Sequence, residues 1–474
     1  MTALWDTQAL VAATGGRPLG KLPDTIGGIS IDTRTLEPGD AFFAIKGDRF
    51  DGHNFATAAM AAGAGLMVVA EEKLPSLGRL SMPMIVVADV LKALEKVGAA
   101  ARKRSKAKII AVTGSAGKTT TKEMLRVALG AAGKVHAADK SFNNHWGVPL
   151  TLARLPADSD FAVFEIGMNH PGEIRPLVKL VRPHIAIITL IAPAHLGHFK
   201  SLEEIAQAKA EIFEGVEPGG YAVVNRDDPR WKLLEAAAKS AGIANIHGFG
   251  ANARANFKLL SCDLAGDHSD FTARIAGKEV SGRIGAPGRH IVQNALAVLG
   301  TAKLAGADVA KAASALAGFT AERGRGKRHV LAHKDGEIVL IDESYNANPV
   351  SMKAALELLA SAPKGEKARR IAVLGDMLEL GQHSAKFHTA LAQNVVAAEP
   401  DIVLLAGKET AALAAALPPA IRSEYREDTD ALKPLLLKML KGGDTVMIKS
   451  SNGVGFSRLV EAVTEKFPAA QVRR

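Results

Sequence analysis

The stretch IIAVTGSAGKTTTKEML, residues 109–125, joins a short apolar run to a helix-like segment through a loop that contains two glycines. Glycines allow successive backbone N–H groups to turn toward phosphate oxygens, and the start of a helix adds a partial positive charge. A lysine followed by a threonine at that start is typical of loops whose ammonium reaches the β- and γ-phosphates of a nucleotide and whose hydroxyl ligates Mg²⁺. The stretch therefore predicts a nucleotide-binding loop formed by Gly114, Ser115, Ala116, Gly117, Lys118, Thr119 and Thr120.

This loop departs from the usual spacing at one position. Five residues before Gly117 the chain has Val112, where the common phosphate-loop pattern has a glycine. An ordinary strand-to-helix turn therefore stays open as an alternative. The lysine and threonine that directly follow the second glycine favour the phosphate site.

Apolar runs alternate with helix-like segments along most of the chain. IIAVT, FAVFEI, IAIITLI and YAVVN form one series, and EIVLID, RRIAVLGD, DIVLLAG and TVMIKS form a second. Between them, GFTAERGRGKR at 318–328 interrupts the pattern with glycine and charge. Such alternation is typical of mainly parallel sheets covered by helices. The sequence therefore predicts an α/β fold in three domains: a small N-terminal α/β domain at 1–105, a central phosphate-loop domain with a mainly parallel sheet at 106–320, and a C-terminal Rossmann-like domain at 321–474.

The composition restricts the class of protein. Of 474 residues, 47% are hydrophobic and 23% are charged, which predicts a globular chain with sizeable cores. The 59 basic against 49 acidic residues give a net charge of +10, which favours an anionic partner such as a nucleotide, a nucleic acid or a membrane surface. Aromatic residues make up only 5%, which argues against a surface on which single-stranded nucleic acid stacks.

The same features bear on the location of the protein. A single cysteine excludes an internal disulfide and fits a reducing compartment. The first residues, MTALWDTQAL, lack the basic start and apolar run of a secretory signal, and no apolar stretch reaches the roughly 20 residues that span a bilayer. We therefore expect a cytoplasmic protein without stable membrane insertion.

Glu165 ends the apolar run FAVFE, which is expected to form a strand. A carboxylate at such a place is costly unless it is paired or bound to a metal, and Mg²⁺ prefers oxygen ligands. Glu165 would complete the metal site that the threonine hydroxyl of the loop begins. A solvated glutamate at the end of a strand is the alternative interpretation.

Lys209 lies in the segment 201–215, which opens with a capping box from Ser201 to Glu204. It falls on the apolar stripe of the expected helix, between Ile205 and Ile212. A lysine there usually extends to the surface. The alternative is a partly buried lysine of lowered basicity that captures CO₂ as a carbamate and then ligates a cation. Upstream, His195 follows an apolar strand, where either a metal or phosphate contact or a structural role is open.

In this order the motifs resemble the Mur ligase family over essentially the whole chain. The TGxxGKT loop of the family matches residues 113–119, and its Asn-Asn-x-x-Gly-x-Pro segment matches Asn143, Asn144, Gly147 and Pro149. The resemblance implies an ATP-dependent ligase that activates a carboxylate as an acyl phosphate, with ATP and Mg²⁺ as cofactors. It implies that Thr119, Glu165, His195 and carbamylated Lys209 ligate metal ions, and that the catalytic groups are Lys118, Glu165, His195, Lys209 and Arg325.

The resemblance also implies further nucleotide contacts. His290 and Asn294 match the adenine-contact region, Arg325 matches an arginine that reaches the ATP phosphates, and Asp342 matches a residue near ATP at a domain interface. The chain departs from the family at Ile291, where an asparagine is usual. It departs again at Ser450-Ser451-Asn452, where Gly-Ser-Arg is common.

Two further regions indicate the substrates that the resemblance implies. The segment 31–55 resembles the uridine-nucleotide-binding region of the family, and the strings ESYNANP at 343–349 and LGDMLELG at 374–381 resemble the branch that adds D-alanyl-D-alanine. The implied partners are therefore UDP-N-acetylmuramoyl-tripeptide and D-Ala-D-Ala, bound by a monomer that does not bind nucleic acid. Other Mur-type or folylpolyglutamate-type ligases and a nucleic-acid-stimulated ATPase are the alternatives. The implied substrate contacts are Thr33, Arg34, Lys46, Gly47, Asp51, Gly52, His53, Asn143, Asn144, Tyr345, Asn346 and Asn348.

Overall fold

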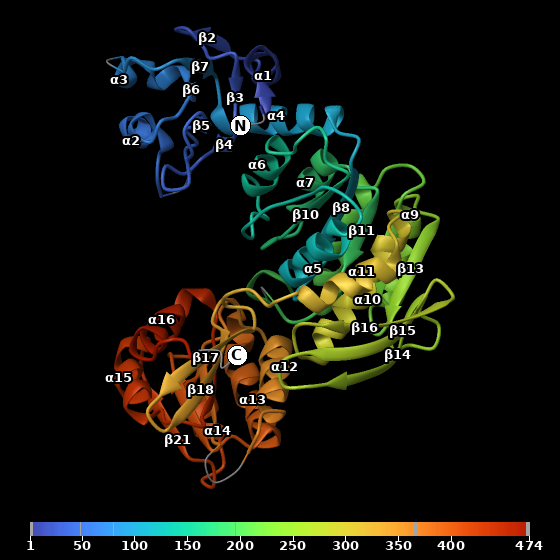
Figure 1. Cartoon of the computed structure of the whole chain (residues 1–474), viewed down its shortest axis with the longest axis vertical. Coiled ribbons are helices and arrows are strands. Elements are labelled where there is room, and N and C mark those ends of the chain that lie inside the picture. The colour runs from blue at the N-terminus through green and yellow to red at the C-terminus, as the bar shows by residue number, and fades with distance from the viewer. Residues whose placement is uncertain (1–2, 48, 79, 195, 365–367, 471–474) are drawn as a thin grey trace.

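The structure is a computed structural model that describes residues 3–470 apart from 48, 79, 195 and 365–367. Three bodies follow one another along the chain, coloured blue, teal to yellow, and orange to red in Figure 1. They are built around sheets of five, nine and six strands, respectively. The three-part α/β fold expected from the sequence is therefore confirmed. In the part of the chain that the structure describes, no helix is long and apolar enough to cross a membrane.

The N-terminal body contains a five-stranded sheet in the order β2-β7-β6-β5-β4. Its strands pair in parallel except for the antiparallel pair β2 and β7, and a separate antiparallel pair joins β1 to β3. The elements are β1 (Trp5–Asp6), α1 (Thr7–Thr14), β2 (Arg17–Leu19), β3 (Thr25–Ile26), β4 (Ile29–Ser30), β5 (Ala41–Phe43), α2 (Ala56–Ala61), β6 (Leu66–Ala70), α3 (Leu74–Leu77), β7 (Met84–Val87) and α4 (Val90–Arg104).

The central body contains a nine-stranded sheet in the order β16-β15-β14-β13-β12-β11-β8-β10-β9. Strands β9 to β14 pair in parallel, as expected, whereas β14, β15 and β16 form an antiparallel edge that the sequence analysis did not foresee. The elements are β8 (Lys108–Thr113), α5 (Lys118–Gly130), β9 (Val135–Ala137), α6 (Gly147–Ala153), β10 (Phe161–Glu165), α7 (Ile174–Val181), β11 (Ile185–Ile188), α8 (Leu202–Ala210), β12 (Tyr221–Asn225), α9 (Trp231–Ser240), β13 (Asn245–Gly250), β14 (Phe257–Leu264), β15 (Ser269–Ile275), β16 (Lys278–Ile284), α10 (Arg289–Leu304) and α11 (Val309–Ala315).

Strand β8 positions the phosphate loop in this sheet. It lies between β10 and β11, and its alternate residues enter two different cores, Ile109 on one face and Ile110 on the other. Burial on both faces explains why the run is continuously apolar. The loop therefore leaves the carboxyl end of an interior strand, which is where open parallel sheets bind ligands.

The N-terminal and central bodies share one hydrophobic core. Helix α4 packs against α6, and the Trp5 indole N–H donates to the Ala153 carbonyl at 2.8 Å. The next residue, Arg154, donates to the Ile29 carbonyl at 2.6 Å. The sequence suggested a simple boundary near residue 105, but these contacts join the two bodies on both sides of it.

The C-terminal body contains a six-stranded sheet in the order β17-β18-β22-β19-β20-β21. Within the described residues, β17 and β18 pair antiparallel and the other neighbouring strands of this sheet pair in parallel. Separate apolar clusters cover the two faces of the sheet. The elements are β17 (Lys327–His333), β18 (Gly336–Glu343), α12 (Pro349–Ala360), β19 (Arg370–Gly375), α13 (Ser384–Ala398), β20 (Ile402–Ala406), α14 (Ala411–Ala416), β21 (Ser423–Arg426), α15 (Thr429–Met439), β22 (Thr445–Lys449) and α16 (Ser457–Lys466).

Candidate functional site

The phosphate loop is held in shape by contacts that only glycine permits. Gly117 has a φ of 82°, and a Cβ there would lie 2.9 Å from Asn294 Nδ2. Gly114 has a φ of 151°, and a Cβ there would overlap the Thr189 hydroxyl. That hydroxyl donates to the Ala116 carbonyl at 2.5 Å, so it ties the loop to the end of the neighbouring strand β11. The two glycines predicted from the sequence therefore have a direct steric reason.

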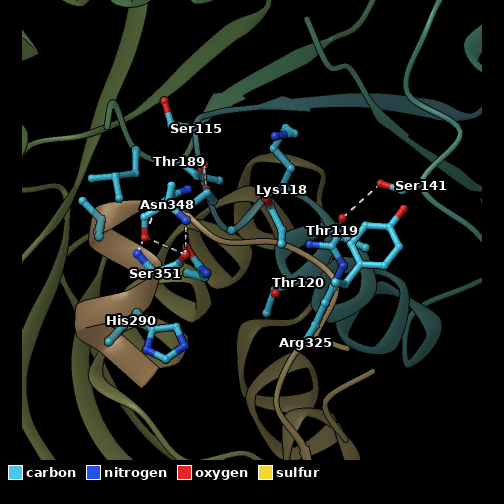
Figure 2. Close-up of a pocket in the computed structure, with 18 of the residues that line it drawn as sticks. Ser115, Lys118, Thr119, Thr120, Ser141, Thr189, His290, Arg325, Asn348 and Ser351 are labelled. Carbon is cyan, nitrogen blue, oxygen red and sulfur yellow. Dashed lines mark hydrogen bonds between the residues drawn. The ribbon is translucent and has the colours of Figure 1, made fainter. Parts of the chain in front are cut away.

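Lys118 begins α5 and points into a pocket between the central and C-terminal bodies (Figure 2). Its Nζ donates to the Gly114 carbonyl at 2.8 Å, which folds the side chain back over the loop. Burial lowers the pKa of Lys118; Glu165 opposes this effect and Arg325 adds to it. The loop thus carries a positive charge that has little solvent around it and that Glu165 compensates in part.

A chain of polar contacts runs from Thr119 to Glu165. The Thr119 hydroxyl lies 3.3 Å from the Ser141 hydroxyl, which donates to Glu165 Oε1 at 2.8 Å. Asn143 Nδ2 donates to the same oxygen at 2.8 Å. Glu165 is only 4% exposed, and its second oxygen, Oε2, is buried without a hydrogen-bond partner. An orphaned carboxylate oxygen beside two hydroxyls is a donor set that fits Mg²⁺.

The charge state of Glu165 agrees with this arrangement. Burial raises its pKa, but Lys118, Arg325 and the hydrogen bonds from Asn143 and Ser141 outweigh that effect, so the net pKa lies below the ordinary value. The carboxylate is therefore ionised at neutral pH. The solvated glutamate considered from the sequence is wrong for this side chain, because Glu165 is buried at the carboxyl end of β10.

Arg325 and Tyr345 bring the C-terminal body to the pocket. The Arg325 guanidinium lies 4.4 Å from the centre of the Tyr345 ring, and Figure 2 shows Arg325 beside Thr119. Tyr345, Asn346 and Asn348, which the resemblance gave as substrate contacts, all line the pocket. Asn348 caps α12 through a hydrogen bond from Ser351 N at 2.9 Å, and its Nδ2 is buried without a partner.

Asp342 does not line this pocket. It is fully buried, and its two oxygens accept from the Gly324 N–H at 2.8 Å and from the Ser344 hydroxyl at 2.6 Å. Asp342, which the resemblance placed near ATP at a domain interface, therefore lies outside the residues that line the pocket. Instead Asp342 holds the backbone residue that precedes Arg325.

His290 and Asn294 lie in the first two turns of α10 and line the pocket. Figure 2 shows His290 on the side away from Ser141. Ile291, the departure from the family pattern, lines it as well. Asn294 is 8% exposed and packs against Gly117, so it supports the loop as well as facing the pocket.

Lys209 is buried in α8, where it is 1% exposed, so the surface position considered from the sequence is wrong. Ser201 caps the helix by accepting from Glu204 N at 3.2 Å. The Glu204 carboxylate accepts from Lys200 N, not Ser201 N, so the predicted capping box is only half formed. No other described residue forms a hydrogen bond or ion pair with the Lys209 ammonium. Burial, with a further contribution from Lys118, holds the pKa of Lys209 well below its ordinary value.

Two other predicted residues have different outcomes. His195, expected to ligate metal, lies outside the described residues. Asn144 does not line the pocket; its Oδ1 accepts from Gly147 N at 2.9 Å and so shapes the start of α6. Among the described residues, no group of three or more His, Cys, Asp and Glu side chains gathers that could hold a metal ion.

The residues expected to bind the uridine nucleotide lie in the N-terminal body, away from the pocket. Asp51 and His53 form a partly buried network in which Asp51 Oδ1 lies 2.6 Å from His53 Nδ1 and Asp51 Oδ2 lies 2.9 Å from Lys73 Nζ. These two residues, with Gly52 packed on the Ala44 backbone, stabilise a turn. The remaining four are accessible: Thr33 is half-buried, and Arg34, Lys46 and Gly47 are exposed.

The sequence analysis missed two residues of the site. Ser141 bridges Thr119 and Glu165, and Thr189 braces the phosphate loop. Neither belongs to a recognisable spacing, because each reaches the loop only through the folding of a separate segment. Their one signal was position: Ser141 precedes the Asn-Asn segment, and Thr189 follows an apolar strand.

The fold and the pocket are those of a phosphate-loop protein in which the Rossmann-like C-terminal domain contributes Arg325 to the pocket beside the loop. Comparison with known proteins identifies the family within this class. Three family models match the chain: the Mur ligase family catalytic domain at 25–102, the Mur ligase middle domain at 112–302, and the Mur ligase glutamate ligase domain at 327–452. The chain belongs to the Mur ligase family, a family of ATP-dependent amide ligases, and the resemblance inferred from its motifs is confirmed.

Individual relatives cover almost the whole chain. The UDP-N-acetylmuramoyl-tripeptide–D-alanyl-D-alanine ligase of Escherichia coli is 34% identical over 442 residues, which cover 93% of this chain and 94% of that protein. A crystal structure of MurF from Acinetobacter baumannii superposes with a TM-score of 0.83 at 30% identity, covering 97% and 99% of the two chains. MurF from Thermotoga maritima, solved in complex with ADP, gives a TM-score of 0.75 at 25% identity, covering 93% and 97%.

Proposed function

We propose that the chain is the ATP-dependent ligase that joins D-alanyl-D-alanine to UDP-N-acetylmuramoyl-tripeptide, releasing ADP and phosphate, in peptidoglycan precursor synthesis. The observation that carries this proposal is the pocket in which Lys118 and the start of α12 face one another from two domains. Relatives that bear this activity in their names cover more than nine-tenths of the chain.

The reaction needs an activated carboxylate, because a carboxylate is a poor electrophile. ATP transfers its γ-phosphoryl group to the carboxylate of the tripeptide, and the amine of D-Ala-D-Ala then displaces phosphate from the acyl phosphate. Phosphoryl transfer is catalysed mainly by positioning and by neutralising charge. Lys118 and the N–H groups of the loop hold the phosphates, and Arg325 adds positive charge from the C-terminal domain.

Mg²⁺, when bound, neutralises charge on the phosphates. Thr119 and Glu165 would hold it, because Glu165 Oε2 is an ionised and unpartnered acceptor beside the Thr119–Ser141 hydroxyls. Carbamylated Lys209 would supply a further oxygen ligand together with His195. The depressed pKa of Lys209 supports this role, since only a neutral amine reacts with CO₂.

The two substrates would bind at opposite ends of the central domain. The exposed Arg34, Lys46 and Gly47 would hold the UDP end, with Thr33 beside them and the turn built on Asp51, Gly52 and His53 in support. Tyr345, Asn346 and Asn348 would contact D-Ala-D-Ala, with Asn143 near the reacting carboxylate and His290, Asn294 near adenine. The division at residues 105 and 320 stays a proposal, supported by the change of sheet at each point. We further propose a monomer that acts in the cytoplasm, where ATP is supplied.

Phosphate release tests this function directly. The chain is assayed with ATP, Mg²⁺, UDP-N-acetylmuramoyl-tripeptide and D-Ala-D-Ala, with each omitted in turn. We expect release only when all four are present. Release that needs glutamate and a folate would indicate the folylpolyglutamate-type alternative, and release stimulated by nucleic acid without either substrate would indicate a different class of ATPase.

A further inference from the structure

Lys122 is a buried lysine that the proposed mechanism does not use. It lies on α5 one turn after Lys118, and its side chain is completely inaccessible to solvent. Burying an ammonium group costs free energy unless polar groups surround it. Its partners therefore indicate what it does.

The partners of Lys122 belong to one loop and one carboxylate. Its Nζ donates to the Ala138 carbonyl at 2.6 Å and to the Lys140 carbonyl at 3.4 Å. Glu123 Oε1 lies 2.8 Å away, and the other oxygen of Glu123 pairs with Arg126. Lys122 thus fastens the segment 138–141, which follows β9, to the phosphate-loop helix.

That segment delivers Ser141 to the site. The Lys140 carbonyl held by Lys122 belongs to the residue immediately before Ser141, and it also accepts from Phe142 N at 2.8 Å. The Ser141 hydroxyl in turn donates to Glu165 at 2.8 Å and lies 3.3 Å from that of Thr119. The phosphate-loop helix therefore sets the position of both hydroxyls, Thr119 directly and Ser141 through Lys122.

We propose that Lys122 is a positioning residue that fixes the 138–141 loop so that Ser141 stays between Thr119 and Glu165, and that it thereby sets the affinity for the nucleotide–Mg²⁺ complex. This inference rests on the proposed function, since it assumes that the Thr119–Glu165 site takes Mg²⁺. Lys122 touches neither substrate nor metal; it acts through the loop.

We expect Lys122→Met to fold with reduced stability, because the Ala138 carbonyl loses its donor while Glu123 keeps Arg126 as a partner and the apolar side chain fills similar space. A structural role alone would lower stability without changing the response to Mg²⁺. Met124→Ala, which removes a fully buried side chain on the same helix away from the 138–141 loop, is the matched control for lost packing.

The experiment measures equilibrium binding of ATP, with and without Mg²⁺, to the full chain and to Lys122→Met, Ser141→Ala, the double variant and Met124→Ala. We expect Lys122→Met to weaken the binding of MgATP about tenfold, which corresponds to the loss of one charge-assisted contact at the metal. The binding of metal-free ATP should weaken less than about twofold. The double variant should lose no more than Ser141→Ala alone, because both changes act through the same hydroxyl.

Each other outcome is informative. Wild-type MgATP affinity in folded Lys122→Met, equal losses with and without Mg²⁺, a loss matched by Met124→Ala, or additive losses in the double variant would each overturn the proposal. If the unsubstituted chain itself bound ATP equally with and without Mg²⁺, the proposed metal site would fail instead, so the two failures are distinguishable.

Discussion

The substitution Gly117→Ala tests whether the phosphate loop needs glycine, because backbone strain lowers the stability of the fold whereas a shifted loop also weakens ATP binding. Gly117 has a φ of 82°, and left-handed backbone costs an alanine about 1–2 kcal/mol. The new Cβ would also lie 2.9 Å from Nδ2 and 3.0 Å from Oδ1 of Asn294, a buried side chain with little room to move. Overpacking of this kind costs about 1–3 kcal/mol. If the loop shifts to relieve it, ATP binding weakens by roughly 5- to 150-fold.

Gly219→Ala is the matched control. Gly219 lies in the same domain with a φ of 76°, and a Cβ there would meet nothing within 4 Å. Denaturant unfolding should show similar losses from backbone strain in the two variants, with a further loss only in Gly117→Ala. Titration with ATP should show weaker binding for Gly117→Ala alone. Wild-type ATP affinity in Gly117→Ala, at a stability equal to that of Gly219→Ala, would refute the reasoning.

Substitutions at three further residues test the proposed function. Lys118→Ala should abolish phosphate release while circular dichroism shows a folded chain, because it removes the charge that meets the phosphates; normal turnover would remove Lys118 from the mechanism. Lys209→Ala should lose most activity, with partial recovery in a short carboxylic acid, and Lys209→Arg should stay inactive because a permanent cation repels the metal. Between the lowered pKa of Lys209 in the folded chain and the ordinary lysine pKa, the unfolded chain binds more protons than the folded chain, so stability should rise with pH over that range. Lys209→Met should flatten that rise, and parallel curves of stability against pH would contradict this account. Arg34→Ala should weaken UDP-muramoyl-tripeptide binding and leave ATP affinity unchanged in calorimetry, because Arg34 lies in another domain; equal losses for both ligands would argue against the partition.

The parts of the site that are local in sequence could be predicted from it. The loop before α5 follows from glycine and helix-start chemistry within a few residues. Helical spacing placed Lys209 on the apolar face with Ile205 and Ile212, although it left open whether the ammonium extends to the surface or stays buried. In both cases the relevant neighbours lie within two turns of the chain.

Contacts between distant segments could not be predicted in this way. The motif matches identified Asp342, Asn144 and Asp51 as site residues. A motif match does not distinguish a side chain that contacts a ligand from one that stabilises a turn. The position of Ser141 depends on where the 138–141 loop meets α5, and the core shared by the first two bodies depends on how α4 meets α6. The hydrophobic pattern of one segment does not specify its partner.

The charge of the pocket explains a feature that composition alone left open. The net charge of +10 was compatible with either nucleic acid or a small polyanion. Lys118 and Arg325 come to the pocket from two domains, and Arg325 lowers the pKa of Lys118, whereas Glu165 opposes that effect. Lys449 lines the same pocket but is already paired with Glu343 at 3.0 Å. The two domains therefore present an excess of positive charge to one another across a small pocket, and an occupant with several phosphate charges would relieve that repulsion. Bound ATP would thus hold the C-terminal domain against the loop as well as supply the phosphoryl group, since removing it leaves two cations facing each other.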